Sequence, residues 1–324
     1  MTREERYQDK KVPESLDELY NDYLKEEHNK IDETNKKEEI YKVENLKKEK
    51  TKKINKKPNK KKIYTNIIIF TFILLIIFSS YKLINLYFDS KKIEKTEKKI
   101  ENIVKEKEVE DTESTIVIEN TEPEESLFWK YIKTPLIDVN INELKKLNND
   151  TLGWIKVGGT NINLPFTQTN NNSYYLTHDL EKKYNEFGWV FSDYRNKVDL
   201  TDNNLIIYGH NTADTSMFGT LRHVITNNWL NNTDNHIINL SLENKNTLWQ
   251  VISVYKVNNT TDYIQTDFDK NEYQDFLNLI TTRSIYKFDT AVNTNDKILT
   301  LSTCSNNDTR IVLHAKLIKY DNKN

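Results

Sequence analysis

The sequence predicts a mainly β domain, either a barrel or a sandwich, that follows a membrane-spanning helix. Short apolar or alternating runs, separated by clusters of Asn, Asp and Gly, recur after residue 150. All five tryptophans lie beyond residue 126, so the large aromatic side chains that build a core are concentrated there. An uncharged and strongly apolar stretch at residues 63–81 precedes this region. These observations divide the chain into a tail, an anchor, a spacer and a folded domain.

We interpret residues 1–62 as a charged cytoplasmic tail. Charged residues make up 30% of the whole chain, and residues 42–62 hold eleven lysines against two glutamates. Lysine-rich flanks favour the cytoplasmic side of a membrane and also bind anionic lipid headgroups. Short helical patterns such as ESLDELYNDYLKEE predict a tail that is mobile or partly helical.

Residues 63–88 are predicted to form a transmembrane anchor. At about 1.5 Å per residue, the uncharged stretch approaches the roughly 30 Å hydrocarbon core of a bilayer. A buried core helix is disfavoured because Ile, Leu and Phe occupy every face between lysine clusters. A cleaved signal peptide is disfavoured because the preceding 62 residues are too long for its basic region. We therefore expect a single-pass protein of the cell membrane with its folded domain outside.

Residues 89–125 are predicted to form an extracytoplasmic spacer, because this segment is highly charged and nearly coreless. Its few apolar residues, Ile93, Ile100 and Val104, indicate at most a short helical stalk. The folded domain is then expected at residues 126–324, a length that a single core can support.

Within this domain, residues 126–150 predict one or two helices. Two further helices are expected at residues 216–224 and 271–283. The remaining apolar runs predict strands, and there is no strand–helix alternation of the kind that builds a doubly wound sheet. The predicted strands are LGWIKV, INLPF, SYYLT, GWVFSD, NLIIYGH, HIINLSL, LWQVISVYKV, KILTLSTC and RIVLHAKLIKY.

Cys304 is the one cysteine of the chain and ends the run KILTLSTC. Outside the membrane a single cysteine cannot form an internal disulfide, so it is buried and inert, paired with another chain, or chemically active. Strand alternation places it on the face of Thr300 and Ser302, beside a polar turn. This context favours a reactive thiol over a structural one.

A reactive thiol needs a base or a cation nearby, because its pKa of about 8.5 leaves little thiolate at neutral pH. His210, which ends NLIIYGH, is the first candidate, and His314 in the last strand is a competitor on the face of Arg310. Arg310 could stabilise an oxyanion, although many such arginines are solvated turn residues. The other histidines are His28 in the tail, His178 and His236 in polar contexts, and His223 in an expected helix.

The strand end TLSTC at residues 300–304, the following Arg310 and the upstream YGHN at residues 208–211 together resemble the sortases. The stretches DKILTLSTC, LIIYGHN and SMFGTL are similar to class B sortases in particular, and the resemblance runs from about Trp129 to the C-terminus. Sortases are membrane-anchored cysteine transpeptidases of mainly Gram-positive bacteria. The resemblance implies an eight-stranded β-barrel with N-terminal helices and a helix before the penultimate strand.

The resemblance also implies functions for particular residues. Cys304 would be the nucleophile, His210 the acid and base, and Arg310 the group that stabilises substrate and oxyanion, while Thr303 and Ser302 would contact substrate. The enzyme would cleave the C-terminal sorting signal of a surface protein after its threonine. It would hold the acyl fragment as a Cys304 thioester and transfer it to an amine, usually of a peptidoglycan precursor. The implied partners are surface proteins with sorting motifs, an amine acceptor and the membrane.

Other functions remain open at this stage. A pilus-type or other protein-linking transpeptidase, or a thiol protease that hydrolyses its substrate, would use the same nucleophile. A surface module for adhesion would not need the thiol. No metal or cofactor is expected, since there is no DxDxDG-like loop, no histidine pair at zinc spacing and one thiol. The formal net charge of -2 gives no indication of a nucleic-acid partner.

Overall fold

The computed structural model describes residues 16–54, 60–119, 122–258, 260–304 and 309–323. The chain forms two compact units, Met1–Phe78 and Ser79–Asn324. The first contains α1 (Leu16–Ile54) and the start of α2 (Lys60–Ile103). The predicted partly helical tail is thus a long helix over its described residues. The side chains of α1 that the structure describes are all exposed, so they form no packed face.

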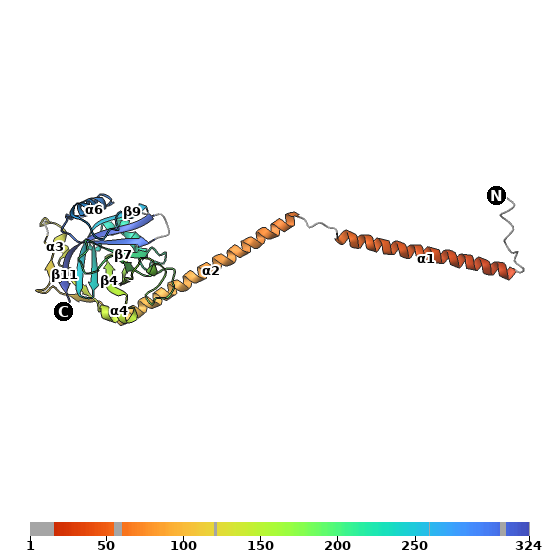
Figure 1. Ribbon diagram of the computed structural model, residues 1–324, viewed down its shortest axis with the longest axis horizontal. Coiled ribbons are helices and arrows are strands. Elements are labelled where there is room, and N and C mark those ends of the chain that lie inside the picture. The colour runs from red at the N-terminus through yellow and green to blue at the C-terminus, as the bar shows by residue number, and fades with distance from the viewer. Residues whose placement is uncertain (1–15, 55–59, 120–121, 259, 305–308, 324) are drawn as a thin grey trace. The chain divides into compact units, whose positions relative to one another are not determined.

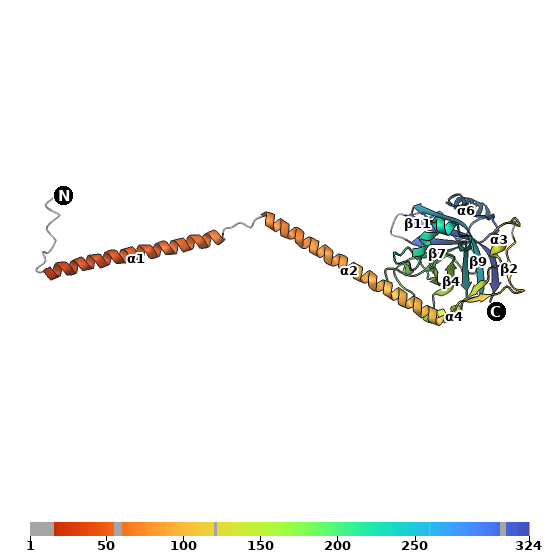
Figure 2. The same cartoon turned by 180° about the vertical axis from the view of Figure 1, so that it is seen from behind.

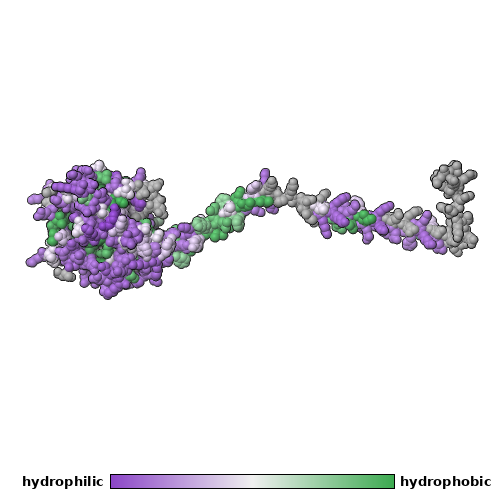
Figure 3. Space-filling view, in the orientation of Figure 1, coloured by the Kyte–Doolittle hydropathy of each residue, from purple (hydrophilic) through white to green (hydrophobic). Residues whose placement is uncertain are grey.

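The first half of α2 carries the predicted anchor. Within the described residues, one helix is long and apolar enough to cross a membrane, and it is this one. Its apolar side chains are exposed on all faces, including Leu75 at 60% and Ile76 at 63%. Figure 3 shows this stretch as a hydrophobic segment followed by a polar one. An exposed apolar surface of this extent is consistent with a membrane anchor.

Eight strands of the second unit form a closed barrel, as expected from the resemblance. Their order is β10-β7-β6-β5-β4-β8-β9-β11, and a β10–β11 pairing closes the ring. The strands are β4 (Thr151–Val157), β5 (Asn163–Thr167), β6 (Phe191–Ser192), β7 (Asn204–His210), β8 (Ile237–Leu242), β9 (Lys245–Asn258), β10 (Ile298–Cys304) and β11 (Thr309–Asn322). Outside the ring, β2 (Ile116–Val117) pairs with β11, and β1 (Lys107–Val109) pairs with β3 (Leu136–Asp138).

One predicted strand is wrong. The run SYYLT forms a short 3-10 helix, η1 (Tyr174–Leu176). The side-chain oxygen of Asn171 accepts hydrogen bonds from the amides of Ser173 and Tyr174, at 2.9 Å each. Such a local bond turns the chain and competes with an extended strand. The run SYYLT is therefore a turn rather than a strand, and its buried side chain is that of Tyr175.

The second unit contains the predicted N-terminal helices and the predicted helix before the penultimate strand, with further short helices between them. After the end of α2 they are α3 (Phe128–Tyr131), α4 (Ile141–Leu147), η2 (Gly219–Ile225), α5 (Asn227–Leu230), η3 (Thr233–Asn235) and α6 (Lys270–Thr282). The helix α6 precedes the penultimate strand, as predicted. Asp269 and Glu272 form a capping box that fixes its first turn.

Two hydrophobic clusters position the site. The larger one fills the barrel interior and includes Leu299, Leu301 and Leu313. The second lies outside the barrel wall, where α6 packs through Phe276 and Ile280 onto β9, β10 and β11. Figures 1 and 2 show α6 on the outer surface of the barrel in both views. The strand β10 is therefore packed on both faces, which makes it a rigid support for its last residue.

The segment expected as a coreless spacer packs on the barrel instead. Ile93, Ile100 and Val104 are buried in the barrel cluster, at 1%, 2% and 7% exposure. Their spacing of seven and four residues puts Ile93 and Ile100 on one face of α2, and Val104, just past its end, continues this face through its amide bond to the Ile100 carbonyl oxygen. Three apolar residues therefore suffice to form a buried stripe. Low average hydrophobicity concealed this stripe. The second half of α2 therefore belongs to the compact unit that begins at Ser79.

Candidate active site

Two predicted site residues meet at the ends of neighbouring strands. The strands β7 and β10 are parallel, and their register pairs Gly209 with Thr303 and His210 with Cys304. Parallel strands end at the same edge of a sheet, so residues far apart in sequence become neighbours there. The side chain of Cys304 and residues 305–308, which include most of the predicted tight turn, lie outside the described part of the structure.

His210 is half-buried and held by its surroundings. Its Nε2 lies 2.8 Å from the carbonyl oxygen of Leu176. A carbonyl oxygen only accepts hydrogen bonds, so Nε2 carries the proton and Nδ1 is the basic atom of the neutral ring. The preceding Gly209 has no side chain, and a Cβ there would lie 2.6 Å from the ring of Phe218. Glycine thus allows the close packing that orients the end of β7.

Arg310 reaches back to the end of β10. Its Nη1 donates a hydrogen bond to the carbonyl oxygen of Thr303, at 3.0 Å. The amide of Ile311 donates to the hydroxyl of the same threonine, also at 3.0 Å. These contacts fasten the first residues of β11 to the residue before Cys304. The guanidinium therefore lies beside the strand end that carries the cysteine, despite the short connection.

Ser302 and Thr303 are buried, at 1% exposure each. The hydroxyl of Ser302 lies 2.9 Å from that of Tyr263, and the hydroxyl of Thr303 is bonded to Ile311. Both side chains therefore have partners inside the protein, which suits a positioning function. Their contact with substrate stays a prediction.

His314, the competing base, is enclosed within the barrel wall. It is fully buried, with Nδ1 2.8 Å from the Thr300 hydroxyl and Nε2 2.8 Å from the Tyr255 hydroxyl. Thr300 donates its proton to Asn204, so His314 donates through Nδ1 and accepts through Nε2. Burial, with a smaller effect of nearby Arg283, lowers the pKa of His314 to about 3. A neutral and fully bonded histidine of this kind is structural.

Sequence reasoning missed a polar cluster that supports the end of β7. The buried carboxylate of Asp193 accepts two hydrogen bonds from the Arg195 guanidinium, at 2.8 and 2.7 Å, and one from the Tyr208 hydroxyl, at 2.9 Å. Although burial opposes ionisation, these donors hold the pKa of Asp193 below its usual value. Arg195 also donates to the carbonyl oxygen of Ile264, at 2.7 Å. Through Tyr208, which lies two residues before His210, this cluster joins β7 to the connection after β9.

A family model described as the sortase domain matches residues 155–318. The chain belongs to the sortase family. The sortase B of Staphylococcus aureus is 37% identical over 183 residues, which cover 54% of this chain and 73% of that protein. The sortase B of Listeria monocytogenes is 33% identical over 183 residues, which cover 55% of this chain and 74% of that protein. These relatives confirm the predicted class B sortase, a cysteine transpeptidase.

Solved sortase structures agree with this assignment. The sortase B of Bacillus anthracis in complex with AAEK1 has a TM-score of 0.58 and 31% identity, covering 72% of this chain and 99% of that one. The Staphylococcus aureus sortase B–substrate complex has a TM-score of 0.52 and 36% identity, covering 55% and 84%. Since both identities exceed 30%, the likeness extends beyond a shared fold. Among the described residues of this sortase, no three His, Cys, Asp or Glu side chains form a group that could hold a metal ion.

The buried His314 makes the stability of the enzyme sensitive to acid. Its pKa is about 3 in the folded state and about 6.5 in the unfolded chain, so protonation favours unfolding. The stability it contributes is complete above pH 6.5 and is lost as the pH falls towards 3. Between pH 7 and pH 4 we expect the free energy of unfolding to fall by about 3 kcal/mol more than in His314→Gln. Urea unfolding followed by tryptophan fluorescence measures this, and equal slopes in the two proteins would contradict it.

Proposed function

We propose that this sortase attaches surface proteins to the cell wall, using Cys304 as nucleophile, His210 as acid and base, and Arg310 to stabilise the oxyanion. The observation that carries this proposal is the pairing of Cys304 with His210 across the β10–β7 ladder. The contact of Arg310 with the carbonyl oxygen of Thr303 adds a fixed positive charge at the same strand end. A nucleophile, a base and a cation on rigid strands are the set that acyl transfer requires.

In the first step the Cys304 thiolate attacks the carbonyl carbon of the threonine in the sorting signal. The carbonyl oxygen gains a negative charge, which the Arg310 guanidinium stabilises. The C–N bond then breaks, and His210 gives a proton to the leaving amine. The products are a thioester on Cys304 and the released C-terminal fragment of the signal.

In the second step an amine attacks the thioester carbonyl carbon. Neutral His210 takes a proton from this amine, a new amide bond forms, and the Cys304 thiolate leaves. Solved complexes of sortase B with a substrate and with triglycine support a pair of substrates of this kind. By analogy, we propose a peptidoglycan amine as the acceptor for this enzyme.

The proposed location follows from the apolar half of α2. Residues 63–88 anchor the protein as a single-pass span, residues 1–62 lie in the cytoplasm, and the catalytic domain of residues 126–324 acts outside. The helix composition supports the span, and the lysine-rich tail supports its orientation.

The test is a transfer assay with the full chain in detergent micelles. A fluorogenic peptide that carries a sorting signal is incubated with and without triglycine, and the products are identified by mass spectrometry. We expect the peptide–triglycine conjugate to be the main product when triglycine is present. Cleavage to the free acid alone, at any triglycine concentration, would indicate a hydrolytic thiol protease and would reject transfer.

A further inference from the structure

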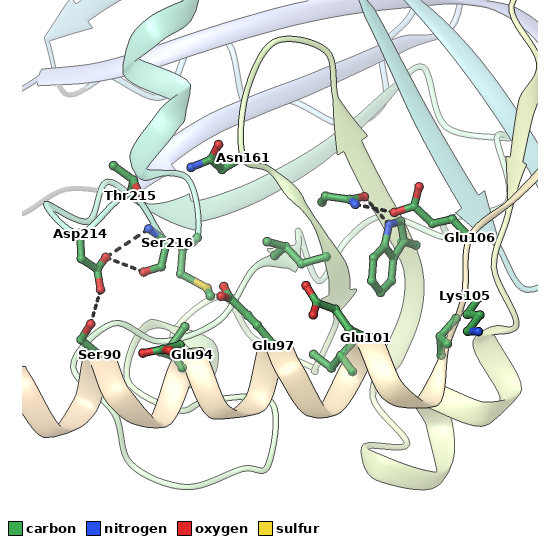
Figure 4. A pocket seen from close by; sticks show the side chains of 17 residues that line it. Ser90, Glu94, Glu97, Glu101, Lys105, Glu106, Asn161, Asp214, Thr215 and Ser216 are labelled. Atoms are coloured by element: carbon green, nitrogen blue, oxygen red, sulfur yellow. Dashed lines mark hydrogen bonds between the residues drawn. The ribbon is translucent and has the colours of Figure 1, made fainter.

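A cavity of about 680 Å³ lies away from the proposed site, inside the unit that begins at Ser79. One wall is the second half of α2, another is the loop of residues 211–217, and the third comes from β4, β5 and their connection. Among the described residues that line it, neither His210 nor Arg310 is present. Figure 4 shows Glu97 and Glu101 of α2 pointing into this space, with Asp214 on the facing loop.

The helix is held to the barrel on both sides of these carboxylates. Its apolar stripe is buried in the barrel cluster. Towards the N-terminal end, the Asp89 carboxylate accepts from the amide of Glu186 at 3.2 Å. Further along, Lys99 forms an ion pair with Glu181 at 2.7 Å, and Glu106, just after the end of the helix, forms one with Lys156 at 2.8 Å. The end of α2 together with Val104 is therefore a strap, which we define as residues 89–104.

The loop under the strap is continuous with the proposed base. It starts directly after His210, and Asn211 forms a β-bridge with Met217 at its closure. Thr215 and Met217 have φ angles of 70° and 48°, in a region that costs free energy for residues other than glycine. The strap contacts this loop through Ser90, whose hydroxyl donates to the Asp214 carboxylate at 2.7 Å. The loop conformation thus depends on groups outside the loop.

The carboxyl groups that meet at this contact differ in pKa. Lys91 and Lys98 lower the pKa of Glu94 to about 2. Burial opposes ionisation of Asp214, but hydrogen bonds from Ser90 and Ser216 keep its pKa below the usual value. Half-buried Glu97 has its pKa raised to about 7, first by burial and then by the negative charges of its neighbours.

The groups facing Glu97 come from each surrounding element. Asp214 faces it from the loop, and Glu94 and Glu101 face it from α2 itself. From the strand wall, Asn161 and Asn163 are neutral, and Asn163 donates to Glu106, which is paired with Lys156. Lys105 lines the far end of the cavity.

We propose that residues 89–104 form a pH-sensitive strap, in which protonation of Glu97 controls how firmly α2 holds the loop that follows His210. With Glu97 neutral, the strap carries no additional charge into a cavity that already contains ionised carboxylates. With Glu97 ionised, repulsion from Asp214 and Glu101 opposes docking. Any effect of the strap on catalysis rests on the function proposed above for His210. The docking equilibrium itself does not depend on that function.

The direction in which docking changes with pH follows from proton binding at Glu97. The docked strap binds a proton at Glu97 more tightly than the detached helix does, because detachment returns the carboxyl to water and its ordinary pKa near 4.5. Docking is therefore strongest in mild acid and weakens as the pH rises from about 4.5 to about 7. Above about pH 7 the contribution of Glu97 protonation to docking is fully lost.

Hydrogen–deuterium exchange of the full chain in detergent micelles tests this, with rates corrected for the intrinsic effect of pH. A Cys304→Ala background keeps the result independent of transfer chemistry. Between pH 5.5 and pH 8 we expect protection of residues 89–104 and 211–217 to fall by roughly tenfold or more. In Glu97→Gln, which keeps the shape of the side chain without its charge, protection at pH 8 should match the acid value.

Two comparisons make the result decisive. Glu124→Gln, which removes an exposed carboxylate outside the cavity, should retain the wild-type pH dependence. Ile100→Ala should reduce protection of the strap at every pH, because it weakens the apolar contact and leaves Glu97 in place. Protection that is constant with pH in the wild type, or an unchanged pH dependence in Glu97→Gln, would overturn the proposal while leaving the transpeptidase assignment intact.

Discussion

Replacement of Cys304 by alanine is expected to lower the rate of peptide transfer by at least about 1,000-fold. The reason is that Cys304 is the proposed nucleophile and the one cysteine of the chain, and loss of a covalent nucleophile removes most of the rate enhancement. The rate of conjugate formation from a sorting peptide and triglycine, measured by liquid chromatography, gives the effect. The peptide and amine are kept at saturating concentrations so that binding does not limit the comparison.

The control for this variant is its thermal stability. Cys304 ends β10, whose preceding residues are held on both faces by packed side chains, so the fold does not depend on the thiol. We expect the melting temperature of Cys304→Ala to stay within a few degrees of the wild type. A folded variant that keeps more than a tenth of the wild-type transfer rate would remove Cys304 from the mechanism.

Replacement of His210 by alanine is expected to lower the transfer rate by roughly 100- to 10,000-fold, the range for loss of a general acid and base. The ring is fixed by its bond to the Leu176 carbonyl oxygen, which leaves Nδ1 for proton transfer. The loss should appear in kcat for both cleavage and transfer, because the proposed mechanism uses His210 in both steps. Steady-state kinetics with varied peptide concentration separate kcat from KM.

Two other histidines provide matched controls for this result. His223 is exposed on η2, so His223→Ala should keep full activity. His314 is buried, and its replacement by alanine should lower the melting temperature, with any loss of activity following the loss of folded protein. Normal activity in His210→Ala, together with an inactive but fully folded His314→Ala, would reverse the assignment.

The sequence predicted the strands and their ends well because both depend on local patterns, whereas the choice of a closed barrel over a sandwich came from the family resemblance. NLIIYGH and KILTLSTC are bounded by polar residues in the sequence, and each forms a strand that ends where the pattern ends. That His210 and Cys304 belong to one site came from the family resemblance, and their register comes from the structure. No local pattern encodes the parallel pairing of strands separated by more than 90 residues.

The missed features are tertiary. The burial of Ile93, Ile100 and Val104 depends on a complementary surface that the barrel supplies. Because so few apolar residues occur in this segment, the sequence alone predicted a spacer. The bond between Ser302 and Tyr263 likewise joins β10 to a loop that has no fixed place in a sequence pattern. The run SYYLT has a strand composition, but a single Asn171 side chain converts it into a turn.

The most direct test of the central claim is the intact mass of the enzyme after incubation with a sorting peptide in the absence of an amine acceptor. A thioester intermediate predicts a mass increase equal to the acyl fragment, located on Cys304 by peptide mapping. Addition of triglycine should discharge this adduct and release the conjugate. Steady conjugate formation without any adduct on Cys304, or an adduct on another residue that triglycine discharges, would rule out Cys304 as the nucleophile.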